Sequence, residues 1–218
     1  MARIARIVIP GFPHHVVQRG NRRQKTFFSD EDYEEYINLL CRHAKKFNTA
    51  ILEYCLMPNH VHLIAVPEKK DSLAKTVGLT HLKYTRMINF REKWRGYLWQ
   101  GRFSSYVLDE RYLLAAVKYI LLNPVRAKIV KDPWDYKWSS AKHHMGMETS
   151  KFISDKLVNS LITDWKEFLG ADITKKEVDL LRLHERTGRP MGDMNFIEKL
   201  EAKVNRSLKR KKPGPKGK

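Results

Sequence analysis

Two strand-like runs joined by a proline-asparagine turn constrain the fold of this chain more than any other feature. Residues 51–57 and 60–66 are rich in apolar and β-branched side chains, and residues 58–59 separate them. This pattern predicts an antiparallel hairpin. Because side chains alternate between the two faces of a strand, His60 and His62 point to the same face. Two imidazoles about 7 Å apart could converge on one metal ion, although a lone His-x-His pair is more often two half-buried side chains.

The segments around the hairpin predict one antiparallel sheet with helices on one face. In chain order we expect strands within 3–20 and at 51–57, 60–66 and 103–108, and helices at about 30–47 and 72–90. The first helix begins with a capping-box pattern at Ser29. The order β-α-β-β-α-β is that of ferredoxin-like α+β folds, which leave one face of the sheet free for a site. His14 and His15 are adjacent on the first strand, so they cannot both reach one site.

A third helix, over about 110–122, carries the second set of candidate site residues. Tyr119 and Asn123 are four residues apart and are neighbours on one flank, although Pro124 biases Asn123 away from helical dihedral angles. An amide oxygen of Asn123 could join the histidine pair around a metal ion, and Tyr119 could attack a phosphodiester polarised by that ion. Tyr112 lies on the same flank as a second candidate nucleophile. The competing interpretation is that Tyr119 is an ordinary half-buried tyrosine. The identity of the metal is also open, because imidazole ligands would accept zinc.

The charge balance indicates a polyanionic partner. The 218 residues carry a net charge of +18, which favours nucleic acid over an anionic membrane because no strongly apolar amphipathic helix stands out. There is no run of about 18 apolar residues and no signal-peptide pattern, and Cys41 and Cys55 are expected to be reduced. We therefore expect a cytoplasmic, nucleoid-associated protein. The expected DNA contacts are Arg19, Arg22, Arg23, Lys83, Arg86, Arg102, Lys209, Arg210, Lys211 and Lys212.

The last third of the chain predicts a helical extension. Two tryptophans in 134–140 indicate a segment packed on the core, and 141–151 is typical of a linker. The helices expected beyond it lie at about 154–169, at 174–188 after a capping box, and at 195–210. The tail from Arg206 contains seven basic residues and no acidic ones, which favours disorder in the free protein. We expect a catalytic domain at 1–145 and a helical extension with a basic tail at 146–218.

Four motifs in order along the chain resemble those of single-tyrosine transposases. Residues 57–62, Met-Pro-Asn-His-Val-His, are similar to the HUH motif, in which a hydrophobic residue separates two histidines. Residues 99–103 and 119–127 resemble two further signatures of the family, and 134–140 resembles another. The resemblance covers about residues 1–145 and is closest to the REP-associated tyrosine transposases.

The resemblance implies a reaction and a role for each site residue. It implies a ferredoxin-like enzyme that cuts and rejoins single-stranded DNA next to a hairpin, using Mg²⁺ or Mn²⁺ and a 5′-phosphotyrosine intermediate. His60 and His62 would then be catalytic metal ligands and Tyr119 the nucleophile. Asn123 would be the third ligand, a place that glutamine fills in much of the wider class. The implied partner is single-stranded DNA with hairpins, such as REP-like palindromes, bound by a monomer or a homodimer.

Two non-catalytic alternatives use the same fold. A domesticated transposase could bind DNA or RNA through its basic surface without cutting it, although the intact set of histidines, tyrosine and asparagine favours catalysis. An RNA-binding ferredoxin-like module would need paired aromatic side chains on central strands. Tyr54 and Phe103 are the candidates for such a pair, but no RNP-type motif is present.

Overall fold

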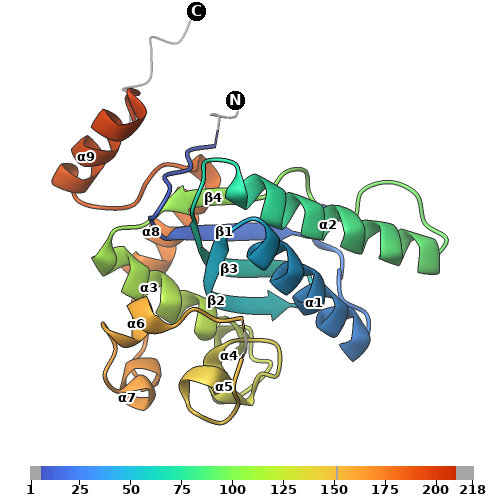
Figure 1. The fold of residues 1–218 in the computed structure, drawn as a ribbon. Coiled ribbons are helices and arrows are strands. Elements are labelled where there is room, and N and C mark those ends of the chain that lie inside the picture. The colour runs from blue at the N-terminus through green and yellow to red at the C-terminus, as the bar shows by residue number, and fades with distance from the viewer. Residues whose placement is uncertain (1–5, 151, 210–218) are drawn as a thin grey trace, which may run out of the picture.

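The computed structural model describes residues 6–150 and 152–209, which contain a four-stranded antiparallel sheet (Figure 1). Its strands are β1 (His14–Arg19), β2 (Thr49–Met57), β3 (His60–Pro67) and β4 (Ser104–Val107). They lie in the order β2-β3-β1-β4, and each neighbouring pair is antiparallel. This arrangement confirms the predicted ferredoxin-like sheet and the hairpin that contains the two histidines.

Two long helices, α1 (Asp30–Lys46) and α2 (Ser72–Arg91), pack on each other and cover one face of the sheet (Figure 1). The predicted capping box opens α1, since the side chains of Ser29 and Asp32 bond each other's backbone N–H groups. The Tyr36 hydroxyl of α1 lies 2.8 Å from Nε2 of His81 on α2, so the buried contact between these helices is partly polar.

The strand register decides which residues share the opposite face. Arg19 of β1 lies directly across from His60 of β3, and directly opposed residues point to the same side of an antiparallel sheet. Alternation then puts His15, Arg19, His60 and His62 on one face and His14 on the other. The expectation that the two adjacent histidines cannot both reach one site is confirmed.

Helices α3 (Glu110–Leu121) and α8 (Lys175–Thr187) lie on the histidine side of the sheet (Figure 1). The side chain of Asp109 caps α3 by accepting a bond from the Tyr112 N–H. The predicted capping box opens α8, and Gly188 ends it in a left-handed conformation with φ 66°. The remaining short helical turns near the sheet are η1 (Asn21–Arg23), α4 (Asn123–Arg126) and η2 (Pro133–Asp135).

The helix predicted at 154–169 is wrong in extent. The structure has two short helices there, α6 (Lys156–Asn159) and α7 (Trp165–Gly170). Asp164 separates them because its side chain caps α7 by accepting a bond from the Glu167 N–H.

The helix predicted at 195–210 is also too long. The observed helix, α9 (Met194–Val204), ends because Asn205 adopts a left-handed conformation with φ 49°. It packs with Ile7 and Ile9 in a second, smaller core. Within the described ranges, no helix is long and apolar enough to cross a bilayer.

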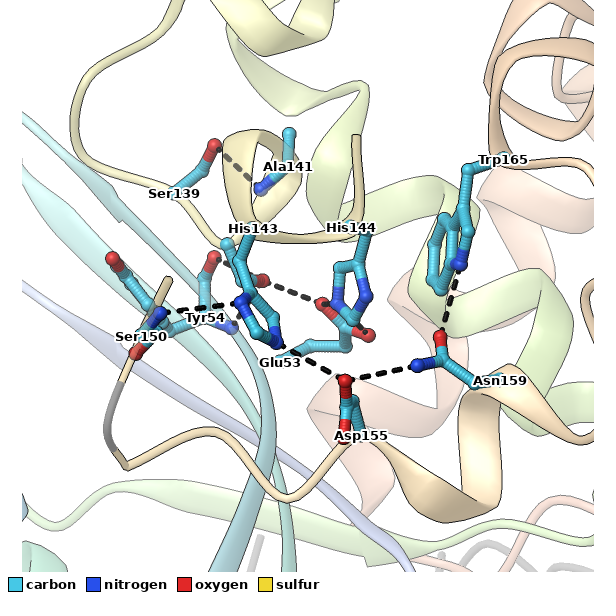
Figure 2. Close-up of polar contacts among 11 residues, drawn as sticks. Glu53, Tyr54, Ser139, Ala141, His143, His144, Ser150, Asp155, Asn159 and Trp165 are labelled. Carbon is cyan, nitrogen blue, oxygen red and sulfur yellow. Dashed lines mark hydrogen bonds and ion pairs between the residues drawn. The ribbon is translucent and has the colours of Figure 1, made fainter. Parts of the chain in front are cut away.

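A buried polar network anchors the segment after Trp138 to β2 (Figure 2). Glu53 of β2 is fully buried and accepts a hydrogen bond from Ser140 Oγ at 2.5 Å. Its Oε1 atom lies 2.8 Å from Nε2 of His144, whose ring stacks on Trp165 with centroids 3.9 Å apart. The prediction of a linker at 141–151 is therefore wrong at its start, where α5 (Ala141–His144) is held in the core.

Both outer strands carry backbone hydrogen bonds to later parts of the chain. The Leu56 N–H of β2 donates to the Trp138 carbonyl at 2.8 Å, and the Met191 N–H donates to the Val107 carbonyl of β4 at 2.8 Å. The Trp138 ring is 8% exposed, so the predicted packing of 134–140 on the core is confirmed.

Candidate active site

His60, His62 and Tyr119 meet on the face of the sheet opposite α1 and α2. The ring centroids of His60 and His62 are 4.9 Å apart, and the Tyr119 ring lies 5.6 Å from that of His62 at an interplanar angle of 86°. The apolar stripe of α3 packs on β2 and β3, which brings Tyr119 to this position. The strand and the helix that were predicted to form one site are in contact, and Tyr119 is only 5% exposed.

Burial keeps the histidine pair uncharged. Burial, with a smaller contribution from the positive charge of Arg19, lowers the pKa of His60 to about 3. Burial also lowers the pKa of His62 well below its ordinary value, and neighbouring His60 and His15 act in the same direction. An uncharged imidazole offers a lone pair, which is the form that binds a metal ion.

His15 and Tyr106 extend the site behind His62. Nε2 of His15 lies 2.9 Å from Nδ1 of His62, and Nδ1 of His15 lies 2.7 Å from the Tyr106 hydroxyl. The Tyr106 hydroxyl also donates to the Leu181 carbonyl of α8 at 3.3 Å. Sequence reasoning missed His15 and Tyr106 as site residues, because only the pairing of β1 with β3 and β4 places them beside the hairpin.

Asn59, in the turn between β2 and β3, contacts the His60 ring and orients it. Oδ1 of Asn59 lies 2.6 Å from Nδ1 of His60, and Nδ2 of Asn59 donates to the Arg23 carbonyl at 3.1 Å. The second bond fixes the orientation of the amide, because a carbonyl can only accept.

Arg126 is a further candidate that sequence reasoning did not single out. Its guanidinium carbon lies 4.6 Å from the centroid of the Tyr119 ring. Its Nη1 atom is buried and has no hydrogen-bond partner among the described residues. Arg126 is seven residues after Tyr119, about two helical turns, so a continuous-helix reading could have placed it on the same flank.

Asn123 and Tyr112 are less closely tied to the site. Asn123 is partly exposed at the first residue of α4, one turn after Tyr119, and its side chain makes no hydrogen bond within the part of the chain that the structure describes. Tyr112 lies two turns before Tyr119 and stacks with Arg111 instead, with the guanidinium 5.8 Å from the ring. Tyr119, rather than Tyr112, therefore lies against the histidines.

The donor atoms at this site fit a divalent cation. Nε2 of His62 is buried and has no hydrogen-bond partner among the described residues, as expected of a nitrogen that awaits a ligand. Two imidazoles and an amide oxygen are a donor set that first-row divalent ions accept. The described residues contain no cluster of three or more His, Cys, Asp or Glu side chains able to hold a metal ion, so any such site would depend on Asn123 or on substrate oxygens.

The predicted DNA-contacting residues near the site lie at the His60 end of the sheet. The Arg19 carbonyl accepts a bond from the Gln100 N–H at 2.8 Å, which brings the end of β1 beside the loop before β4. Arg22, Arg23 and Arg102 are exposed in this region. These four arginines form a basic margin beside His60.

Three other predicted DNA contacts, Lys83, Arg86 and Lys209, are not brought to the site. Lys83 and Arg86 are exposed on α2, which covers the far face of the sheet. Lys209 is paired with Glu198 at 2.8 Å. The predicted contacts Arg210, Lys211 and Lys212, and the rest of the basic tail after them, lie outside the described residues.

The aromatic pair considered for RNA binding is not available for stacking. Tyr54 and Phe103 are 5% and 7% exposed. The Arg6 guanidinium already covers the Phe103 ring, 3.5 Å from its centroid. Base stacking on the sheet, as in ferredoxin-like RNA-binding modules, therefore has no exposed platform at these two residues.

Solved structures that match this chain include two transposases. A REP-associated tyrosine transposase bound to a REP hairpin matches with a TM-score of 0.57 and 21% identity, over 68% of this chain and 88% of that chain. A candidate transposase from Deinococcus radiodurans R1 matches with a TM-score of 0.39 and 17% identity, over 59% of this chain and 92% of that chain. The first match shows a shared fold. A search of curated proteins gives no match.

The sequence model of one protein family matches more than half of the chain. The family is described as IS200-like transposases, and the match covers residues 10–123. This span includes both histidines, Tyr119 and Asn123. The chain therefore belongs to the IS200-like transposase family.

Proposed function

We propose that this chain is a metal-dependent tyrosine strand transferase of the REP-associated kind, which cuts and rejoins single-stranded DNA beside a hairpin. The observation that carries the proposal is the contact between Tyr119 and the histidine pair, with 5.6 Å between the ring centroids of Tyr119 and His62. A tyrosine beside uncharged imidazoles that could hold a metal ion suits covalent phosphoryl transfer. Membership of the IS200-like transposase family and the fold shared with a REP-associated tyrosine transposase support this reaction class.

In the proposed reaction the Tyr119 oxygen attacks the phosphorus of a phosphodiester. A bond forms between that oxygen and phosphorus, and the bond between phosphorus and the 3′-oxygen breaks. The phenol proton passes to solvent, the 3′-oxygen gains a proton, and the DNA is left as a 5′-phosphotyrosine and a free 3′-hydroxyl. Because the phosphotyrosine is itself a phosphodiester, attack by another 3′-hydroxyl rejoins the strand and releases Tyr119.

The surrounding residues would hold the metal ion and the phosphate. His60, His62 and Asn123 would bind Mg²⁺ or Mn²⁺, which when bound would polarise the phosphate and stabilise charge on the leaving oxygen. Arg126 would hold the phosphate against Tyr119, since its buried Nη1 has no partner among the described residues and a guanidinium matches phosphate oxygens.

Exposed aromatic side chains near the basic margin favour single-stranded DNA as the partner. Phe90 is 89% exposed, Tyr97 84% and Trp94 45%. Aromatic rings beside cationic side chains bind unpaired bases by stacking while the cations contact phosphates. Phe90 lies in the last turn of α2, and Trp94 and Tyr97 lie in the loop that follows. This loop adjoins η1, since the Asn21 N–H donates to the Leu98 carbonyl at 2.8 Å. We propose that the unpaired strand crosses this loop toward His60.

The test is formation of a covalent protein–DNA adduct. Labelled single-stranded hairpin DNA from the flanks of the gene would be incubated with protein and Mn²⁺, then separated on a denaturing gel. We expect an adduct that EDTA abolishes and that Tyr119→Phe does not form. Tyr112→Phe is the matched control, because it removes a hydroxyl from the same helix away from the histidines, and it should form the adduct normally.

Each of the other outcomes identifies the part of the proposal that is wrong. An adduct formed by Tyr119→Phe would refute the nucleophile, and cleavage unaffected by EDTA would refute the metal site. If no flanking sequence is cut but hairpin DNA binds tightly in a salt-sensitive way, the chain is a non-catalytic DNA-binding protein.

A further inference from the structure

We propose that two backbone carbonyls, of Arg23 and Leu181, set the tautomers of His60 and His62 so that both imidazoles turn an unprotonated Nε2 toward the site. The Arg23 carbonyl belongs to the basic turn η1, and the Leu181 carbonyl belongs to α8 in the C-terminal extension. The inference deepens the proposed function, since a metal ion at this site would bind these two lone pairs.

One direction satisfies every group in the chain of hydrogen bonds behind His62. When the Tyr106 hydroxyl donates its single proton to the Leu181 carbonyl, it accepts from Nδ1 of His15 at 2.7 Å. Nδ1 of His15 therefore carries a proton. A neutral imidazole has one N–H, so Nε2 of His15 accepts from the Nδ1–H of His62 at 2.9 Å. Nε2 of His62 is then the nitrogen with the lone pair.

The opposite direction would leave two buried groups without partners. If the Tyr106 hydroxyl donated to Nδ1 of His15, the Leu181 carbonyl would lose this donor, and His15 would donate from Nε2 to Nδ1 of His62. Nε2 of His62 would then carry a buried proton with no acceptor among the described residues, which is disfavoured. A His15 ring with protons on both nitrogens would be a buried cation without an acidic partner, which is disfavoured as well.

The same reasoning applies to His60. Nδ2 of Asn59 donates to the Arg23 carbonyl at 3.1 Å, so the Asn59 amide turns its oxygen toward His60. That oxygen accepts, and Nδ1 of His60 must donate across the 2.6 Å separation. Nε2 of His60 is again left with the lone pair.

The unpartnered nitrogen of His62 decides between the two directions. Its Nε2 is the ring nitrogen that is buried without a hydrogen bond among the described residues, while its Nδ1 is bonded to His15. A buried N–H without an acceptor would be an unexplained loss, whereas a lone pair that awaits a cation accounts for the vacancy in its hydrogen bonding.

The extension is docked so that its carbonyl reaches this chain of bonds. Ser104 and Tyr106 lie on one face of β4, and their hydroxyls donate to the carbonyls of Glu185 and Leu181 on α8. Two residues along a strand span about 6.6 Å, and four residues along a helix span about 6 Å, so the two spacings match. The C-terminal extension thereby positions His62, a candidate metal ligand that lies within residues 10–123, the span of the family match.

The first measurement needs no metal and no DNA. Long-range proton–nitrogen correlation spectra of histidine side chains in the metal-free protein report which ring nitrogen carries the proton. We expect His15, His60 and His62 all as Nδ1–H tautomers. An Nε2–H form of either His60 or His62 in the unmodified protein would overturn the inference.

The second measurement removes the connecting groups. Tyr106→Phe keeps the ring but deletes the hydroxyl, and Asn59→Ala deletes the amide. We expect each variant to mix the tautomers of the histidine it serves and to weaken Mn²⁺ binding in calorimetry by about 10-fold, the low end for groups that orient metal ligands. Unchanged tautomers together with unchanged Mn²⁺ affinity would refute the proposed positioning.

Matched controls delete the same groups elsewhere. The Tyr84 hydroxyl of α2 donates to the Thr26 carbonyl at 2.6 Å, and Nδ2 of Asn89 donates to the Gly96 carbonyl at 3.0 Å. Tyr84→Phe and Asn89→Ala should leave the tautomers and Mn²⁺ affinity unchanged. If the spectra show the expected tautomers but the unmodified protein binds no Mn²⁺, the inference about the tautomers stands and the proposed metal-dependent function fails.

Discussion

Replacing His144 with alanine would leave Glu53 as a buried carboxylate with Ser140 Oγ as its remaining side-chain partner in the described network (Figure 2). The side chains of Glu53 and His144 are both 0% exposed, so bulk water does not reach this pair in the unmodified protein. The substitution also removes the stacking of the His144 ring on Trp165. The contact between α5, α7 and β2 would therefore lose its polar centre.

The size of the effect can be estimated for His144 and compared with that for its neighbour, His143. Breaking a buried ion pair by removing one partner destabilises a protein by about 3–5 kcal/mol. His143 pairs with Asp155 at 3.2 Å, but their side chains are 14% and 35% exposed, and pairs nearer the surface contribute about 0–1 kcal/mol. For a chain of this size, 1 kcal/mol shifts the melting temperature by about 2–4 °C. His144→Ala should thus melt roughly 6–20 °C below the unmodified protein, and His143→Ala within about 4 °C of it.

Thermal unfolding followed by circular dichroism, with urea titration at 25 °C, measures both variants. Equal losses for His143→Ala and His144→Ala would refute the reasoning, because the His144 pair is fully buried and the His143 pair is not, and only His144 stacks on Trp165. A double variant, Glu53→Leu with His144→Leu, adds a second test. It should recover part of the loss, since removing both polar partners leaves no buried carboxylate unpaired.

Three further predictions concern pH, backbone space and DNA binding. Burial lowers the pKa of His81 to about 3, so the folded chain binds fewer protons than the unfolded one between about pH 6.5 and 3. The free energy of unfolding should therefore decline as pH falls through this window. In urea titrations, His81→Gln should make this decline less steep by up to about 1.4 kcal/mol per pH unit. An unchanged slope in the variant would contradict the role given to His81. Gly20→Ala should destabilise the fold because its Cβ would clash with the Gln24 carbonyl oxygen. Gly78→Ala in α2 meets nothing within 4 Å and should stabilise the fold by about 1 kcal/mol in the same assay. Replacing both Arg22 and Arg23 with alanine should reduce the magnitude of the slope of log affinity against log salt for single-stranded DNA by about 1.4. An unchanged slope would mean that these two arginines do not contact phosphates.

Local patterns were sufficient for the sheet, its two covering helices and half of the candidate site. The turn between two apolar runs predicted the hairpin, and strand alternation put His60 and His62 on one face. The helix period predicted α3 and thus the position of Tyr119. These features depend on neighbours within a few residues, which a single sequence displays.

Features that depend on pairing between distant segments could not be predicted. His15 and Tyr106 reach His62 only through the register of β1 with β3 and β4, and nothing local in the sequence specifies that register. Exposure of Lys83 and Arg86 could be expected from α2, but not that α2 covers the face away from the histidines. Side-chain caps such as that of Asp164 also divided a helix that apolar periodicity alone predicted as continuous.

The hydrogen bonds that Trp138 makes to β2 and Met191 makes to β4 bear on how copies of this chain can associate. An unpaired outer strand is a template on which another molecule can add a strand, which is a common route to aggregation and domain swapping. Here the chain's own later segments occupy part of each outer strand, so a second copy would have to displace them before it could continue the sheet. Removal of those segments by proteolysis would turn a self-limited sheet into one open to addition at both sides.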